Sequence, residues 1–431
     1  ADVHLGDWGL QMGMLTSALR HRDPALPWFA APTGPWPEAA PLTLAGLELL
    51  YPEAAEACRA DAARMDEARA DTARLQSGDP ALTALWRSLR TLSLESQVAD
   101  FERLGVRFDL LNGESDVDAL IAPMIADLRA RGVAEESDGA LVVAIEQPDD
   151  KKAMPPLLLA KRDGAALYAT TDLATIADRV GRMEVARIVY VVDQRQALHF
   201  EQVFRAARRS GLAGGAELRH VGFGTVNGPD GKPYKTRQGG VARLSDLLGE
   251  AVDKAAERIA DSGYGASLSE EERAELAARV GIAAIKFADL SGDRLSGYVF
   301  DPERLVSFEG RTGPYLQYAC VRIRSVLSKA EERGDRAGAP RPDAPAECDL
   351  LLSCLDFPNA VAESARLMQP GLLAEHSFVL AQRFSRFYAD CPILGAEDPA
   401  ERGSRLALCA LTQAVLERSM ALLGIEVPER M

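Results

Sequence analysis

The periodicity of the sequence changes along the chain, and this change constrains the fold more than any other feature. Short apolar runs alternate with helical segments between Ala140 and Val226. Five of these runs are predicted to be strands: 140–145, 157–160, 165–168, 187–192 and 217–226. Such alternation is typical of a doubly wound α/β domain with a mostly parallel sheet, in which ligands bind at the carboxyl ends of the strands. Beyond these runs the pattern becomes helical, so we expect an α/β region followed by an all-α region.

Helical periodicity also precedes the strands. Residues 1–26 predict a strand, a tight turn and a helix, and residues 27–135 are mainly helical. The clearest helix begins with Asp79 as its N-cap and Pro80 as its first residue, and it ends at Gly105. We therefore expect a helical insertion within the α/β domain.

The C-terminal helices carry clear end signals. A capping box, formed by Ser269 and Glu272, opens one helix. The last strong helix is predicted over 404–423, with Gly424 as its stop. Residues 334–345, rich in Gly, Ala and Pro, are predicted to be a loop between helices.

Charge and cysteine usage exclude several classes of protein. With 49 Lys and Arg against 64 Asp and Glu, the net charge is −15, which argues against nucleic-acid binding unless basic residues are concentrated locally. The six cysteines include no Cys-x-x-Cys pair, so we predict scattered core thiols, with neither a metal site nor a disulfide framework. No apolar run approaches the ~18 residues that a membrane helix needs. We expect a cytoplasmic protein without membrane contact.

A glycine-rich loop at 227–240 follows the last predicted strand. Between Gly231 and Ser245 the chain has no acid and four basic residues: Lys232, Lys235, Arg237 and Arg243. In an acidic chain, such a loop after a core strand favours phosphate binding, although its spacing is not that of a Walker loop. A solvated surface loop is the alternative.

Tyr168 and Asp172 lie where a predicted strand gives way to a helix. A hairpin turn at 161–164 is predicted to lead into the strand 165–168, and the helix is predicted to begin at Thr170. A carboxylate beside a phenol suits a cationic ligand, because a guanidinium pairs bidentately with carboxylate and stacks on aromatic rings. In the alternative, Asp172 caps the helix and Tyr168 is half-buried core.

Polar residues also follow the strand predicted at 187–192. The stretch 194–199, Gln-Arg-Gln-Ala-Leu-His, stands where ligands bind in α/β folds. A histidine at the start of a helix is also consistent with a cap or with a satisfied core group. Both interpretations of His199 remain open at this point.

The helix predicted after Pro314 has two different faces. Apolar residues form a core stripe: Leu316, Cys320, Ile323 and Leu327. The other face interleaves rings and basic groups: Tyr315, Tyr318, Arg322 and Lys329. Exposed rings of this kind stack on unpaired nucleotides. In the alternative, the tyrosines pack on a neighbouring helix.

Several motifs together resemble the class I aminoacyl-tRNA synthetases and, within them, the arginyl-tRNA synthetases. They occur in this order: 4–13 (HLGDWGLQMG), 168–174 (YATTDLA), 195–200 (RQALHF), 223–226 (FGTV), 230–237 (DGKPYKTR), 308–319 (FEGRTGPYLQYA) and 429–431 (ERM). Each motif alone is weak. Their order along the whole chain makes the resemblance specific.

The resemblance implies a Rossmann-like catalytic domain followed by an all-α anticodon-binding domain. Residues 1–245 would be the catalytic domain with its helical insertion at 27–135, residues 246–310 a helical stem, and residues 311–431 the anticodon-binding domain. The first class I signature, His-x-Gly-His, should precede the segment 7–9 and is not in this sequence. We therefore expect a catalytic domain truncated at its N-terminus and a chain that is inactive alone.

The resemblance also implies roles for individual residues. The substrate arginine would be bound by Tyr168, Asp172 and Gln196. The basic loop would act in catalysis through Lys232, Lys235 and Arg237. ATP would be contacted by His199, Gly224, Val226 and Gly239. The anticodon would be bound by Tyr315, Tyr318, Arg322 and Met431.

The implied reaction has two steps. Arginine attacks the α-phosphate of ATP to give arginyl-adenylate and pyrophosphate, and the 3′-terminal adenosine of arginine tRNA then accepts the arginyl group. Such transfers depend on positioning and charge stabilisation, and Mg²⁺ would enter with ATP rather than occupy a protein site. The partners would be arginine tRNA, L-arginine and ATP, and the chain would be a monomer. The alternative is a non-catalytic synthetase paralogue that binds tRNA or arginine.

Overall fold

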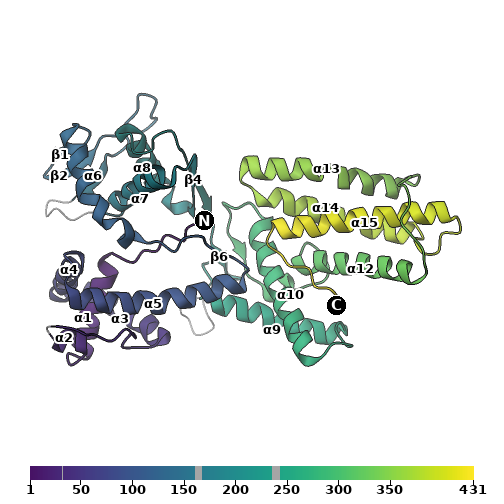
Figure 1. The fold of residues 1–431 in the computed structure, drawn as a ribbon, viewed down its shortest axis with the longest axis horizontal. Helices are drawn as coiled ribbons and strands as arrows, with labels where there is room; N and C mark the ends of the chain where they lie inside the picture. The colour runs from purple at the N-terminus through teal and green to yellow at the C-terminus, as the bar shows by residue number, and fades with distance from the viewer. Residues whose placement is uncertain (32, 161–166, 235–242) are drawn as a thin grey trace. The chain divides into compact units, whose positions relative to one another are not determined.

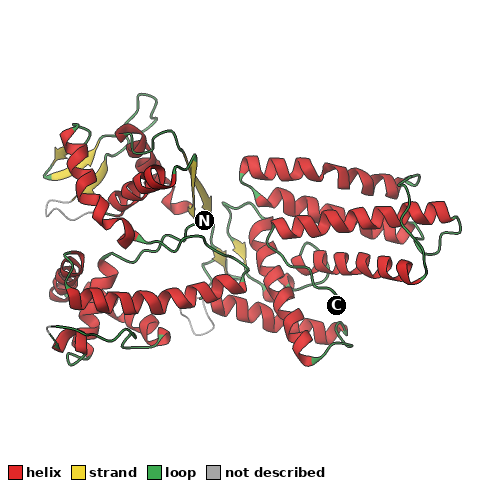
Figure 2. Cartoon of the chain, in the orientation of Figure 1, coloured by secondary structure: helices red, strands yellow, loops and turns green. Residues whose placement is uncertain are grey.

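The chain divides into two units by its internal contacts. Residues 1–190 and 197–220 form the first unit, and residues 191–196 and 221–431 form the second. The computed structural model describes the whole chain except residues 32, 161–166 and 235–242 (Figure 1). Helices make up most of both units, and the strands are short (Figure 2). The hairpin turn predicted at 161–164 lies outside the described residues.

The first unit begins with a block of helices. These are α1 (Leu10–Arg22), α2 (Pro27–Ala30), α3 (Leu44–Ala60), α4 (Ala62–Gln76) and α5 (Pro80–Arg103). Their apolar faces meet around the buried side chains of Leu15, Trp28 and Leu85. The helical character predicted for this part of the chain is therefore confirmed. The hydrophobic core of the block is formed by residues of the block alone.

The ends of this block follow partly from local chemistry. The Asp79 carboxylate accepts hydrogen bonds from the N–H groups of Ala81 and Leu82, so the predicted N-cap of α5 is confirmed. The extended segment before α1 is not a strand. It pairs through isolated parallel bridges, Asp2 with Leu110 and Leu5 with Gly113, because its partner segment is equally short.

The next part of the first unit mixes helices with short strands. Its elements are η1 (Glu114–Val117), α6 (Asp118–Ala130), β1 (Glu135–Ser137), β2 (Ala140–Val143), β3 (Leu157–Ala160) and α7 (Tyr168–Met183). The three strands form an antiparallel sheet, so the expectation of a mostly parallel sheet is wrong here. Asp138 and Gly139 have φ angles of 52° and 79°, the conformation of a two-residue hairpin turn, which joins only antiparallel strands.

The α/β part ends with β4 (Arg187–Asp193), η2 (Gln194–Gln196), α8 (Ala197–Ser210) and β5 (Glu217–Phe223), and β4 pairs with β5. The strand predicted at 187–192 is present as β4, and its side chains alternate between core and solvent: Tyr190 is buried and Val191 is 63% exposed. An apolar run does not reveal which of its residues face solvent. The strand predicted over 217–226 is interrupted after Phe223.

The second unit continues with a pair of short strands and three helices. β6 (Val226–Asn227) pairs in parallel with β7 (Tyr298–Val299), and the helices are α9 (Leu244–Ser262), α10 (Glu270–Ser291) and α11 (Pro302–Leu305). The predicted capping box opens α10. The Ser269 N–H donates to the Glu272 carboxylate at 2.7 Å, and the Glu272 N–H donates to the Ser269 hydroxyl at 3.2 Å.

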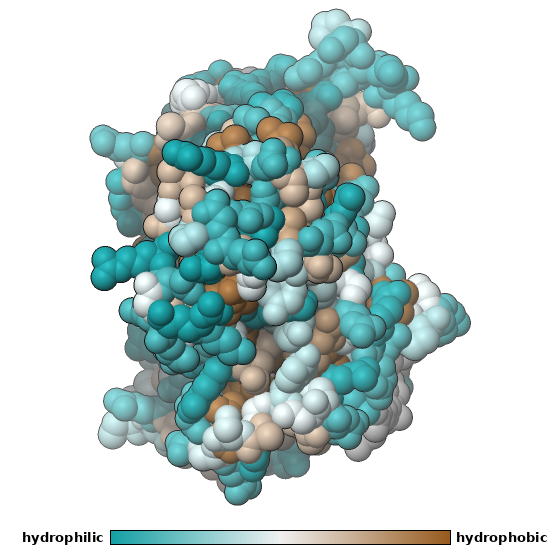
Figure 3. All heavy atoms as spheres, turned by 90° about the vertical axis from the view of Figure 1, so that its right-hand side faces the viewer, coloured by the Kyte–Doolittle hydropathy of each residue, from teal (hydrophilic) through white to brown (hydrophobic). Residues whose placement is uncertain are grey.

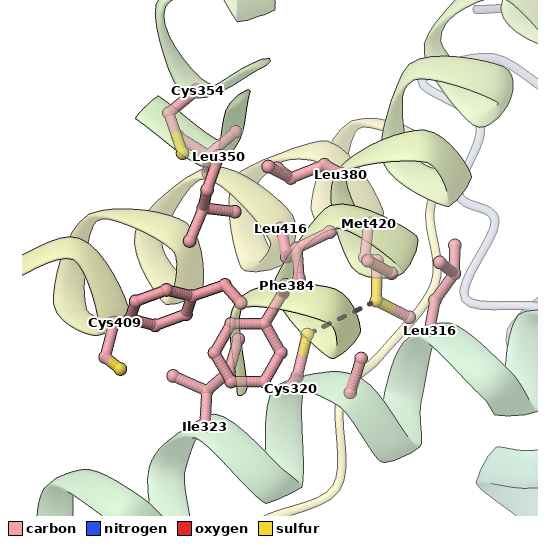
Figure 4. Packing of buried hydrophobic residues seen from close by; sticks show 14 of the residues in the cluster. Leu316, Cys320, Ile323, Leu350, Cys354, Leu380, Phe384, Cys409, Leu416 and Met420 are labelled. Carbon is pink, nitrogen blue, oxygen red and sulfur yellow. Dashed lines mark hydrogen bonds between the residues drawn. The ribbon is translucent and has the colours of Figure 1, made fainter. Parts of the chain in front are cut away.

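A bundle of long helices ends the chain: α12 (Gly313–Glu332), α13 (Pro345–Leu367), α14 (Pro370–Asp390) and α15 (Pro399–Leu422). The predicted apolar stripe of α12 is confirmed, since Leu316, Cys320 and Ile323 are fully buried in the bundle core (Figure 4). The Cys320 thiol lies 3.8 Å from the Met420 sulfur. Gly424, with a φ of 68°, follows α15 as the predicted stop.

The surface and the thiols agree with the composition. Five of the six cysteines are buried and the sixth is half-buried, which fits the prediction of core thiols, and the structure contains all six as free thiols. Burial raises the pKa of the Cys320 and Cys409 thiols to about 12. Hydrophilic side chains cover most of the face in Figure 3, with apolar groups between them. Among the described residues, no helix combines the length and apolarity needed to cross a membrane.

Candidate functional site

Tyr168 and Asp172 lie one turn apart at the start of α7, so they share one face of the helix. Tyr168 is the first residue of α7 rather than the end of a strand, and Asp172 is therefore not the helix cap. Tyr168 is 57% exposed, and its hydroxyl donates to the Gln11 side chain at 3.4 Å. The interpretation of Tyr168 as half-buried core is wrong, and its ring is accessible to a ligand.

The surroundings of Tyr168 are fixed from two sides. The hydroxyl of Thr170, which is fully buried, donates to the Leu159 carbonyl of β3 and so ties α7 to the sheet. On the other side, a Cβ built on Gly9 would lie 2.7 Å from the Gln11 side-chain oxygen and 3.3 Å from the Tyr168 hydroxyl. Glycine at position 9 therefore allows the start of α1 to approach the phenol closely.

Asp172 already has a nitrogen partner. The Nε2 atom of His199 lies 2.6 Å from its Oδ2 atom, and the carboxylate is 13% exposed. His199 comes from the first turn of α8 and packs edge-on against Phe200 at 5.1 Å. The resemblance implied that His199 contacts ATP, whereas the structure brings it together with a residue assigned to arginine. The ATP assignment of His199 stays a prediction.

Sequence reasoning missed Glu114, a second acid in this part of the first unit. Burial, with Asp7 and Asp172 nearby, raises the pKa of Glu114 to about 7, although the Trp8 N–H donates to it. Asp7 is neutralised within the fold by Arg90, at 2.6 Å, and by the Ser115 hydroxyl, at 2.9 Å. Glu114 follows Gly113, which bridges to Leu5. No local pattern reveals a neighbour so distant in sequence.

Gln196 and the glycine-rich segment belong to the second unit. Gln196 is an exposed residue of η2, and its predicted contact with arginine stays a prediction. The Gly224 N–H donates to the Arg294 carbonyl at 2.7 Å, and a Cβ on Gly224 would lie 2.6 Å from the Gly297 nitrogen. This glycine is therefore required by a close backbone approach, whatever its relation to ATP.

The basic loop is described only in part. Val226 pairs with Tyr298 between β6 and β7. Lys232 is exposed, and its carbonyl accepts a hydrogen bond from the Gly228 N–H at 2.8 Å in a turn after β6. The predicted residues Lys235, Arg237 and Gly239 lie outside the described part of the chain. Within the described part, no group of three His, Cys, Asp or Glu residues could hold a metal ion.

The rings of α12 are half-buried rather than exposed. Tyr318 lies 5.6 Å from the ring of Tyr264, and burial beside Tyr318 raises the pKa of the Tyr264 phenol. Tyr315 packs on Phe378 at 5.8 Å and is within hydrogen-bond distance of the Ser385 hydroxyl, at 3.3 Å. The expectation of a fully exposed aromatic face is therefore wrong. The rings border the core and pack on neighbouring segments, as the alternative held.

Arg322 continues this row of rings on α12. Its guanidinium carbon lies 3.9 Å from the ring centre of Tyr388 in α14, a cation–π contact. Tyr388 is 37% exposed and was missed by sequence reasoning, because its contact with Arg322 joins two distant helices. Met431 is half-buried at the end of the chain. Stacked rings and guanidinium planes of this kind bind unpaired bases.

The chain is similar to known proteins along its whole length. Residues 2–302 match the family of class I tRNA synthetases (R), catalytic domain, and residues 316–431 match the DALR anticodon binding domain. The chain is 50% identical over 433 residues to the arginine–tRNA ligase of Maricaulis maris, and 48% identical over 434 residues to that of Hyphomonas neptunium. Each match covers 100% of this chain and 74% of the relative.

Solved structures of arginyl-tRNA synthetases also match the chain along its whole length. The arginyl-tRNA synthetase of Thermus thermophilus matches with a TM-score of 0.79 at 25% identity, over 100% of this chain and 75% of that chain. The arginyl-tRNA synthetase of Plasmodium falciparum matches in fold with a TM-score of 0.80 at 24% identity, over 100% of this chain and 69% of that chain.

Proposed function

This chain belongs to the class I arginyl-tRNA synthetases, and on that premise we propose that its residues serve the ligation of arginine to its tRNA, with the first unit holding the amino acid. Arginine would react with ATP to form arginyl-adenylate, and the tRNA would then accept the arginyl group. ATP would arrive as its Mg²⁺ complex, with the metal bridging phosphates. The protein would act as a monomer in the cytoplasm.

The observation that carries the arginine assignment is the contact between His199 and Asp172. The Nε2 atom of His199 lies 2.6 Å from the Asp172 carboxylate. This contact supports an orientation of the carboxylate that suits a nitrogen donor. A guanidinium offers two parallel N–H groups, so it pairs with both carboxylate oxygens and displaces the single donor of His199. The exposed ring of Tyr168, one turn away, supplies a face for stacking.

Glu114 is a second acid for the same ligand. Its raised pKa reflects a carboxylate that is desolvated near other acids. A cation bound beside it would offset that unfavourable environment and lower the pKa again. Two acids also explain preference for arginine over neutral amino acids, because each is left without a cation when a neutral side chain binds.

The other assigned residues divide between phosphates and tRNA. Lys232, Lys235 and Arg237 would stabilise the developing charge on the phosphates of ATP. ATP would also be contacted by His199, Gly224, Val226 and Gly239. Tyr315, Tyr318, Arg322 and Met431 would bind the anticodon. The contact of Arg322 with Tyr388 supports this surface, since it adds a guanidinium plane to the rings.

Calorimetry with arginine and citrulline tests the assignment. Citrulline has the shape of arginine without its charge, so we expect only arginine to bind the wild-type chain. Asp172→Ala should weaken arginine binding about 100-fold, the loss of two charge-assisted hydrogen bonds. Asp178→Ala is the matched control, because Asp178 lies on the same helix and pairs with Arg182. Equal affinity for both ligands would contradict the proposal.

An aminoacylation assay separates the ligase from a binding module. The ligase transfers labelled arginine to arginine tRNA and supports arginine-dependent exchange of pyrophosphate into ATP. A paralogue that binds arginine or tRNA without activating either would show affinity in calorimetry and neither reaction.

A further inference from the structure

The last seven residues, 425–431, form an irregular C-terminal tail that α10 and α12 hold in place. Figure 1 shows the end of the chain beside α12. The carbonyl of Glu426 accepts a hydrogen bond from Gln317 at 2.7 Å, and the carbonyl of Pro428 accepts one from Arg324 at 2.8 Å. Just before the tail, the Gly424 carbonyl accepts a hydrogen bond from Lys286. Three side chains thus bind three alternate carbonyls.

The spacing of these contacts follows from regular geometry. In an extended chain every second carbonyl points the same way, which matches the carbonyls of 424, 426 and 428. Gln317 and Arg324 are seven residues apart on α12, so two helical turns place both on one face. The tail therefore runs alongside α12 in the same direction.

The contacts on α10 have the same seven-residue spacing. Lys286 binds the Gly424 carbonyl, Arg279 lies 3.7 Å from the Glu426 carboxylate, and Glu272 lies 2.5 Å from Arg430. As the tail proceeds towards the chain end, its contacts move towards the N-terminus of α10, whereas on α12 they move towards the C-terminus. One polar stripe of α10 therefore follows the tail from its start almost to the chain end.

Burial makes the attachment firm. Ile425 is 3% exposed and Pro428 is also buried, so buried apolar side chains anchor the tail in addition to its bound carbonyls. Gln317 is fully buried, and its amide also donates to the Arg279 carbonyl at 3.3 Å, which joins α10 to the tail. The donors bind backbone atoms, so they fix the path of the tail rather than select its side chains.

We infer that Lys286, Gln317 and Arg324 are positioning residues that hold the tail in one path and so present Met431 to the tRNA. The inference rests on the proposed role of Met431 at the anticodon. A free tail would have to be ordered when tRNA binds, at a cost in conformational entropy. The bound carbonyls avoid that cost because the path is already set in the free protein.

Carboxypeptidase digestion tests the attachment without tRNA. Release of Met431 from Arg324→Ala should be about tenfold faster than from the wild type, because the charge-assisted hydrogen bond to the Pro428 carbonyl is lost together with the ion pair between Arg324 and Glu417. Arg324→Lys, which keeps a cationic donor, should restore slow release. Arg366→Ala is the matched control, because that arginine pairs with Glu363 on the surface of α13. Equal rates in Arg324→Ala and the wild type would overturn the inference.

Filter binding of arginine tRNA tests the consequence. Arg324→Ala should weaken tRNA binding about fivefold with unchanged arginine affinity. In a chain lacking Met431, the same substitution should have no further effect, because Arg324 acts through that residue. Additive losses would overturn the positioning role. If wild-type chain binds no tRNA, the proposed function fails, while the digestion rates still decide whether the tail is held.

Discussion

The two candidate binding regions present their tyrosines in opposite ways. In the first unit Tyr168 is 57% exposed and lies one helical turn from Asp172, and the second acid, Glu114, is near Asp172. In the second unit Tyr315 and Tyr318 are half-buried, and they pack against the rings of Phe378 and Tyr264 in the same unit. On the proposed function, arginine would be recognised by charge at an exposed ring, whereas the tRNA would meet rings whose positions are already fixed by packing. The second arrangement lowers the entropy that ordering would cost.

The largest expected effect is a loss of stability that separates the buried core of the bundle from its ring surface. Phe384→Ala should lower the free energy of unfolding by about 3–5 kcal/mol, because it empties a fully buried position next to Leu316 and Cys320. Tyr388→Ala, one turn along α14, should cost only about 1 kcal/mol because that ring is partly exposed. Urea unfolding of both variants measures this difference, and similar losses would mean that the ring surface is part of the core.

The next effect concerns the ring surface itself. Tyr318→Ala should weaken tRNA binding by about 1–3 kcal/mol, the contribution of one stacked base. Tyr318→Phe should bind almost normally, because it keeps the ring and its packing on Tyr264. Filter binding at two salt concentrations separates this stacking from charge contacts, since only the latter weaken with salt. A loss in Tyr318→Phe as large as in Tyr318→Ala would assign the effect to the hydroxyl.

A smaller effect is the pH dependence of arginine affinity, which tests the role of charge in the first unit. Glu114 has a pKa raised to about 7, so it carries a proton below that pH and must lose it to pair with a guanidinium. Arginine affinity should therefore rise about tenfold between pH 6 and pH 8 and then level off. Glu114→Gln should bind more weakly at pH 8 and show a flatter profile. Unchanged pH dependence in that variant would remove Glu114 from arginine binding.

Signals carried by neighbours in sequence predicted structure well. The N-cap at Asp79, the capping box at Ser269 and the stop at Gly424 depend on residues within one turn, and all are confirmed. The antiparallel sheet had such a signal in Asp138 and Gly139, but the βα rhythm around it favoured parallel strands.

The candidate site was predictable only where one helix carries its parts. Tyr168 and Asp172 were predicted to be neighbours at a junction between a strand and a helix, and the structure places both on one face of α7. His199 reaches Asp172 from a different helix. Glu114 is near Asp7 because two short segments bridge at Leu5 and Gly113. These neighbours depend on tertiary packing, which no local pattern encodes.

The most direct test of the central claim is a crossed measurement of two ligands on two variants. Arginine affinity and tRNA affinity are determined for Asp172→Ala and for Tyr318→Ala. We predict that Asp172→Ala loses arginine binding and keeps tRNA binding, and that Tyr318→Ala does the reverse. Parallel loss of both ligands in either variant, with the fold intact by circular dichroism, would contradict the division of the two roles between the two units.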